Sequence, residues 1–200
     1  MSNSQVGTYK LVASPFHLDV RGKLSMGVLG KHLLNCADAY AAERGFDVVE
    51  QGGEHYTWVL SRLAIELEDL PSCHESFSIQ TWVENVYRLF ADRNFVICNK
   101  DEKPIGYVRS VWAMSSMETR NPASLLDLHG DRITNSICEK ECPIAKPGRV
   151  KVSQQEAVSE YVAKYSDLDI NGHVNSIKYI EHILDIFPLD TYKKKDLKRF

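Results

Sequence analysis

The segment "SDLDINGHVNSIKYIEHIL" (166–184) gathers side chains that can do chemistry immediately before an apolar pattern of helical period. Asp169, Asn171 and His173 alternate along it. The N-terminus of a helix offers free N–H groups and a positive dipole to a carbonyl oxygen. A histidine there can exchange a proton with water near neutral pH, an amide can orient water or substrate, and a carboxylate can hold the neighbouring N–H groups. The segment therefore predicts an acid–base site at the start of a helix over about 174–187.

Each of these residue types also has an ordinary structural explanation. Turn aspartates and N-capping asparagines precede many helices, and we keep that interpretation for Asp167 and Asn175. A histidine beside a glycine is more often a structural residue than a catalytic one. The structural alternative therefore stays open for any one of these residues taken alone.

The elements that must position this segment form an α+β pattern. An apolar stripe predicts a helix over 26–44, with Gly45 as its C-terminal cap. Long aromatic and β-branched stretches predict strands at 8–13, 56–67, 75–86, 88–99 and 103–117. A further strand is expected at 155–166. One helix followed by adjacent strands favours a curled antiparallel sheet wrapped around that helix.

The chain contains an internal repeat. Moving the sequence by 150 positions places "LDVRGKLS" (18–25) over "LDINGHVN" (168–175), and His32 over His182. Asn171 and His173 of the second copy correspond to Arg21 and Lys23 of the first. Because packing needs only the shared positions, the additional polar groups predict chemistry in the second copy alone. This concentration in one copy is what makes Asp169, Asn171 and His173 the catalytic candidates.

Composition narrows the class of protein. The 200 residues are 44% hydrophobic and 26% charged, with a net charge of −3, which argues against a nucleic-acid binder. No stretch is apolar enough for a membrane span, and the first residues lack a secretory signal. Five scattered cysteines suit a reducing compartment, so we expect a cytoplasmic protein. "CEKEC" (138–142) has no partner cluster for a metal, and Gly52–Gly53 lacks the context of a phosphate loop, so no cofactor is expected.

"YSDLDINGHVNSIKYIEHIL" (165–184) closely resembles the signature of the acyl-acyl-carrier-protein thioesterases of bacteria and plant plastids. "TWVLSRLAIELEDLPSCHESFSIQTWVE" (57–84) and "SVWAMSSMETRNP" (110–122) resemble the first half of the same family. The resemblance implies a double hotdog, in which a long helix is wrapped by an antiparallel sheet. It implies an acyl-binding, non-catalytic hotdog at 1–142, a linker at 143–152 and the start of a catalytic hotdog at 153–200, whose sheet we expect to be truncated at Phe200.

The resemblance also implies a function. The reaction would be hydrolysis of the thioester of fatty acyl-acyl carrier protein, which releases a free fatty acid. Asp169, Asn171 and His173 match the catalytic loop of the family, whose further glutamate would lie on a strand after Phe200. The acyl chain would bind between helix 26–44 and the sheet.

The expected partners are acyl carrier protein and its acyl-phosphopantetheine, with no nucleic acid and no membrane, and the protein could act as a homodimer. An acidic carrier would dock on basic residues, for which the candidates are Lys193–Lys195, Lys198, Arg199, Arg149 and Lys151. One alternative is an acyl-CoA thioesterase with Asp169 as base or nucleophile, because single-hotdog enzymes share the looser form D-x-D-x-x-G-H-V-N. Another is a non-catalytic acyl-binding fragment.

Overall fold

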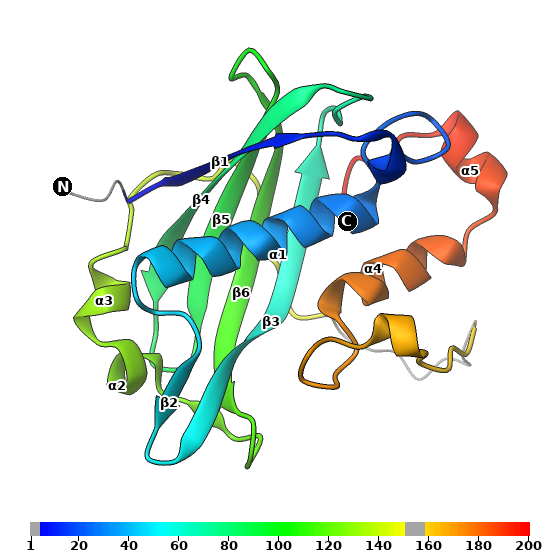
Figure 1. Ribbon diagram of the computed structural model, residues 1–200. Helices are drawn as coiled ribbons and strands as arrows, with labels where there is room; N and C mark the ends of the chain where they lie inside the picture. Colours follow the sequence, from blue (N-terminus) through cyan, green and yellow to red (C-terminus); the bar gives the residue numbers. More distant parts are fainter. Residues whose placement is uncertain (1–4, 151–158) are drawn as a thin grey trace.

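The computed structural model describes residues 5–150 and 159–200 and shows one long helix, α1 (Met26–Glu43), lying across a curled antiparallel sheet (Figure 1). The strands within these residues follow the order β1-β4-β5-β6-β3-β2, and β7 pairs with β6. Their bounds are β1 Gly7–Val12, β2 Val49–Gln51, β3 Glu54–Leu67, β4 Ser76–Val86, β5 Ala91–Cys98, β6 Pro104–Ser116 and β7 Pro122–Ala123. The predicted α+β arrangement of a helix wrapped by a sheet is confirmed.

Helix α1 matches the prediction within one residue because its sequence supplies both ends and an apolar face. Ser25 caps the start, where its side chain accepts the N–H of Val28 at 3.4 Å. Gly45 follows the end with a φ of +69°, a left-handed conformation that glycine adopts without strain. The face toward the sheet is buried and includes Leu29, Leu33, Ala37 and Ala41.

The sheet packs on both faces. Successive residues of a strand point to opposite faces. On β5, Arg93 therefore lies toward α1, while Asp92 and Asn94 face the other side and contact Lys146 and Glu84. The outer face carries a separate apolar cluster of Trp82, Val96, Cys98, Cys142 and Ile144. The segment 143–150 has no regular structure, but it is held against this outer face.

Two parts of the prediction differ from the structure. Strand β2, which pairs with β3, lies outside the predicted strands, and two short helices, α2 (Leu125–His129) and α3 (Asp131–Thr134), were not predicted. The prediction of a strand at 155–166 is wrong for residues 159–166, the part that the structure describes. Residues 155–158 lie outside the described residues, 159–164 have no regular structure, and Tyr165–Asp167 form one 3-10 turn, η2. An extended segment needs a hydrogen-bonded neighbour, and none of the described strands pairs with this one.

The second copy adds α4 (Ser176–Asp185) and α5 (Leu189–Lys194), which lie on the β3 side of the sheet (Figure 1). Ile177 and Ile180 of α4 are buried in the same core cluster as α1. The approach of the helices is close, since a Cβ on Gly30 would lie 2.6 Å from Cδ1 of Ile177. After α5, Phe200 exchanges two backbone hydrogen bonds of 2.9 Å with Ile65 of β3. No helix in the described part of the chain is long and apolar enough to cross a membrane.

Candidate functional site

The loop that carries the candidate residues is organised by a single carboxylate. Oδ1 of Asp169 accepts the backbone N–H groups of Asn171 at 2.8 Å and His173 at 3.0 Å. The N–H of Asp169 donates to the carbonyl oxygen of His173 at 2.8 Å, which closes the loop. Gly172 has a φ of +73° and takes the left-handed position that this tight turn requires. Asp169 therefore fixes the backbone from which the other two side chains project.

The first copy builds the same loop with the same bonds. Oδ1 of Asp19 accepts the N–H groups of Arg21 at 2.9 Å and Lys23 at 3.3 Å, and Gly22 also has a φ of +73°. The internal repeat found in the sequence is thus a repeat of backbone geometry. Because Asp19 does this work in the copy without the candidate set, holding the loop is a structural role that the two aspartates share.

The copies differ in what the outer side chains touch. In the first copy, Arg21 forms ion pairs with Asp19 at 2.7 Å and Asp196 at 3.1 Å, and Lys23 pairs with Asp69 at 2.9 Å. In the second copy, no residue within 5–150 or 159–200 forms a hydrogen bond or ion pair with the side chains of Asn171 or His173. These two side chains are available to a ligand, whereas their first-copy counterparts are occupied.

The neighbouring polar residues support the loop. Oδ1 of Asn175 accepts the N–H of Ile177 at 2.9 Å and caps α4, as its sequence position predicts. Asp167 is buried and accepts the N–H of Lys164 at 2.7 Å and the hydroxyl of Tyr161 at 2.9 Å. The backbone hydrogen bond from Lys164 is the main cause that lowers the pKa of Asp167. His182 lies 3.4 Å from the same carboxylate, so it belongs to this support.

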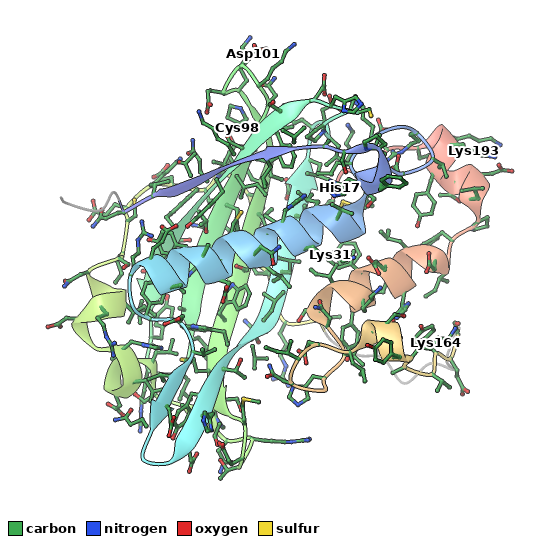
Figure 2. The ribbon with its side chains drawn as sticks, viewed as in Figure 1. His17, Lys31, Cys98, Asp101, Lys164 and Lys193 are labelled. Carbon is green, nitrogen blue, oxygen red and sulfur yellow. The ribbon has the colours of Figure 1, made fainter. Side chains whose placement is uncertain are left out.

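The equivalent support in the first copy uses histidines. His17 takes the place of Asp167 and accepts the N–H of Ser14 on Nδ1 at 3.3 Å. Figure 2 shows His17 beside the N-terminal end of α1. Its ring lies 5.5 Å from that of His32, the counterpart of His182, and burial lowers the pKa of His32. His32 and His182, which the repeat aligns, therefore each lie beside the residue at the matching position before the loop, His17 in the first copy and Asp167 in the second.

A cavity of about 420 Å³ lies between α1, the sheet and the loop. The second copy contributes Asp169–Asn171 and His173–Ser176 to its wall. The first copy contributes the remaining wall, which is Leu34, Asn35, Ala37, Asp38 and Ala41 of α1, Phe46, Val48, Thr57, Trp58, Val59, Leu60, Val83, Ala91, Arg93, Trp112 and Ile133. One space is therefore shared by an apolar first-copy pocket and the polar second-copy loop.

The structure brings Asp169, Asn171 and His173 together at this cavity, which lies where the acyl-chain pocket was expected. The predicted strands contribute Trp58, Leu60 and Trp112 to its wall, whereas Trp82 lies on the opposite face of the sheet. Sequence reasoning missed Asn35 and Asp38, whose spacing of three on a helix was the available signal. It also missed Arg93, which nothing in the local pattern marks. Within the described ranges, no group of three or more His, Cys, Asp or Glu is placed to hold a metal ion.

A long helix on a curled antiparallel sheet, with a second loop–helix copy beside it, defines a hotdog-type fold. The family model "Acyl-ACP thioesterase N-terminal domain" matches residues 8–130, and "Acyl-ACP thioesterase C-terminal domain" matches residues 150–200. The chain therefore belongs to the acyl-ACP thioesterase family.

Two similar curated relatives come from plants. A chloroplastic palmitoyl-acyl carrier protein thioesterase of Gossypium hirsutum is 25% identical over 170 residues, which are 82% of this chain and 41% of the relative. Oleoyl-acyl carrier protein thioesterase 2 of Arabidopsis thaliana is 28% identical over 72% of this chain and 42% of its own length. The chain thus spans less than half the length of the curated relatives it matches.

Solved structures agree on the fold. An acyl-ACP thioesterase from Bacteroides thetaiotaomicron is 58% identical, with a TM-score of 0.88 over 98% of this chain and 79% of that one. The 12:0-ACP thioesterase of Umbellularia californica has a TM-score of 0.79 at 16% identity, over 98% of this chain and 75% of its own, which supports the fold alone.

Proposed function

We propose that this chain acts in the hydrolysis of fatty acyl-acyl carrier protein thioesters, which releases a free fatty acid. The observation that carries the proposal is the shared cavity, in which Asn171 and His173 meet an apolar space under α1. An acyl chain in that space brings its thioester to the loop. Family membership and the 58% identity to a solved acyl-ACP thioesterase support the same reaction.

The side chains at the loop have distinct tasks in this proposal. His173 takes a proton from the attacking water, since a histidine can serve as a general base near neutral pH. Asn171 orients the water or the thioester through its amide. The N-terminus of α4 presents backbone N–H groups to the oxyanion that forms on the carbonyl. Asp169 keeps both side chains in place through the loop.

Acyl carrier protein as partner is part of the proposal. Its docking site stays a prediction, because the basic candidates are partly occupied. Lys193, seen on α5 in Figure 2, lies 3.4 Å from Asp190, and Arg199 lies 3.2 Å from Glu66. Arg149 is exposed, and Lys151 lies outside the described residues.

The domain bounds at 142 and 153, the cytoplasmic location and the homodimer also stay predictions. The five cysteines are all free thiols, a state that a reducing compartment preserves and that supports the cytoplasmic location.

The test compares turnover of acyl-acyl carrier protein with turnover of acyl-CoA that carries the same chain. The proposal expects a clearly higher kcat/KM on the carrier protein. A preference for acyl-CoA would favour the acyl-CoA thioesterase alternative. Acyl binding with no turnover of either thioester would favour a non-catalytic acyl-binding protein.

A further inference from the structure

Arg93 is a buried cation that has no anionic partner among the described residues. Its residue is 6% exposed, and it lies on the face of β5 that packs toward α1. Its Nη1 atom is buried, and no atom of the described residues accepts a hydrogen bond from it. No carboxylate in the described chain lies within ion-pair distance of its guanidinium. Buried charges are normally paired and hydrogen-bonded, because an unpaired one loses its hydration without compensation.

Aromatic rings account for part of this environment. The guanidinium carbon lies 4.7 Å from the centre of the Tyr40 ring and 6.0 Å from that of Phe46. Such cation–π contacts stabilise the positive charge but supply no hydrogen bond acceptor. Burial lowers the pKa of Arg93 to about 10, so the side chain keeps its charge at neutral pH. The Nη1 group therefore remains a buried donor without an acceptor among the described residues.

Arg93 belongs to the wall of the same cavity as the catalytic candidates, but at a different place along it. The loop before α4 lies on the β3 side of the sheet (Figure 1). Strand β5 is two strands from β3 in the sheet order, which corresponds to roughly 10 Å at the usual strand spacing. A chain that enters at the loop and runs under α1 across β3 and β6 therefore reaches Arg93 with its distal part.

The surroundings of Arg93 in the cavity are otherwise apolar. Val83, Ala91, Phe46 and Ile133 line the wall with it. A purely hydrocarbon chain end placed here would leave the guanidinium donors unsatisfied and remove any remaining water. A chain that carries an oxygen at this depth would satisfy them and lose little of the apolar contact.

We propose that Arg93 selects acyl chains that carry an oxygen acceptor on their distal part, a hydroxyl, keto or carboxylate oxygen that accepts a hydrogen bond from the guanidinium. Arg93 is then a specificity-determining residue and takes no part in bond cleavage. The proposal rests on the proposed function in one respect, since the acyl chain must occupy this cavity.

The test measures binding of free fatty acids to the protein, which requires no hydrolysis. Three ligands of equal chain length are compared by calorimetry: a saturated acid, an acid with a hydroxyl on its distal part, and an α,ω-dicarboxylic acid. We expect the oxygenated acids to bind at least ~10-fold more tightly than the saturated acid, the scale of one hydrogen bond to a charged group. The dicarboxylic acid binds more tightly than the hydroxy acid if charge neutralisation dominates, and the reverse holds if the hydrogen bond dominates.

The variants separate Arg93 from a general preference for polar ligands. Arg93→Met keeps the length of the side chain and should abolish the preference, while Arg93→Lys should keep part of it. Arg109→Met is the matched control, because Arg109 lies on the neighbouring strand but contacts Glu84 and Cys142 away from the cavity. This control should bind the ligands as the unmodified protein does.

Equal affinity for the three acids in the unmodified protein would overturn the inference even if Arg93→Met failed to fold. An unchanged preference in a folded Arg93→Met variant would overturn it as well. A preference for oxygenated acids without any thioester turnover would reject the proposed function but leave the role of Arg93 standing. Turnover of saturated acyl chains without a binding preference for oxygenated acids would support the proposed function and reject the role of Arg93. Failure of every acid to bind would overturn both.

Discussion

Arg21 and Lys23 are each held by a carboxylate, whereas Asn171 and His173 at the matching positions leave their side chains free at a cavity. The backbone that presents these two pairs is the same in both copies. The difference in function proposed for the two copies therefore needs only a change of side chains, on a loop whose shape the same pair of hydrogen bonds fixes in each copy.

The first prediction is a loss of turnover on removing either free side chain. His173→Ala and Asn171→Ala should each lower kcat by ~10²-fold or more, since the proposed function has both acting on the water or the thioester in the transition state. Steady-state kinetics on acyl-acyl carrier protein measure the effect, and circular dichroism checks the fold.

Lys23→Ala is the matched control and should have little effect on kcat. Arg21→Ala is a second control with the same expectation, although it removes two ion pairs where Lys23→Ala removes one. Equal losses in both copies would contradict a division of labour.

The second prediction separates the structural role of the loop aspartates from catalysis. Asp169→Ala and Asp19→Ala each remove the acceptor of two backbone N–H groups, so each should lower the free energy of unfolding by about 1–2 kcal/mol. Only Asp169→Ala should also lower turnover strongly, because only its loop carries the candidate side chains. Urea denaturation and kinetics on the two variants test this. A large loss of turnover in an Asp19→Ala variant that is fully folded would contradict this separation of roles.

At the scale of elements, the position of the site depends on how α4 packs on α1. The glycines at 27 and 30 let α4 approach, and Ile177 fills the space beside Gly30. Because the loop 168–175 leads directly into α4, any displacement of that helix moves Asn171 and His173 relative to the cavity.

The third prediction follows from this contact. Alanine normally stabilises a helix interior by about 1 kcal/mol relative to glycine. Gly30→Ala should instead destabilise the protein and lower turnover, because its Cβ would meet Ile177 at 2.6 Å. Thermal unfolding and kinetics measure both effects. In the double variant Gly30→Ala, Ile177→Ala the clash is absent, so its loss should be smaller than the sum of the single losses. Additive losses would show that the contact does not position α4.

Sequence periodicity predicted the long elements and failed on the short ones. Helix α1 and strands β3 to β6 extend over enough residues for an apolar period to be read, and their ends fall within three residues of the prediction. β2 and α3 have three and four residues, too few for a period. The segment 155–166 has the composition of a strand, but pairing is a property of its neighbours and cannot be read from the segment itself.

The candidate site was predictable where it is local and not where it depends on tertiary structure. Asp169, Asn171 and His173 stand within five residues of one another, and the repeat marks them as additional. Arg93 reads as an ordinary charged residue of a strand. Its significance comes from facing α1 beside Tyr40, which only the register of β5 in the sheet determines.

At the scale of the whole molecule, the sheet separates two apolar regions that are stabilised differently. The side that faces α1 holds two clusters with helix residues, and one of them includes α4. The outer side is covered by the segment after residue 138, where Lys140 accepts the indole N–H of Trp82 on its carbonyl at 2.9 Å. The folded unit is thus closed by residues 138–146 on the outer side of the sheet and by α4 on the side that faces α1.

The fourth prediction concerns the pH dependence of folding stability. His129 is 3% exposed and stacks on Trp58, and burial, assisted by the charge of Arg132, lowers its pKa from 6.5 to about 4. Between these values the unfolded chain binds a proton and the folded chain does not, so stability falls as the pH falls. By pH 4 the free energy of unfolding is about 3 kcal/mol lower because of His129 alone. Burial lowers the pKa of His32 in the same direction.

Urea denaturation at pH 7 and at pH 5 measures this dependence. His129→Phe keeps an aromatic ring against Trp58 but does not titrate, so its stability should change less between the two pH values. An identical change in both proteins would show that His129 is protonated in the fold.

The edge of β3 that faces away from β6 pairs with two different segments of the chain. Its start pairs with β2 as far as Tyr56, and its end donates the N–H groups of Ile65 and Leu67 to residues 200 and 198. Between these points no described strand pairs with this edge, although the stretch includes wall residues of the cavity. In heavy water, the two ends of this one strand should retain their amide protons while its middle exchanges them sooner. The faster exchange should be confined to the amides in the middle of β3 that point away from β6, since those that point toward β6 are paired with it.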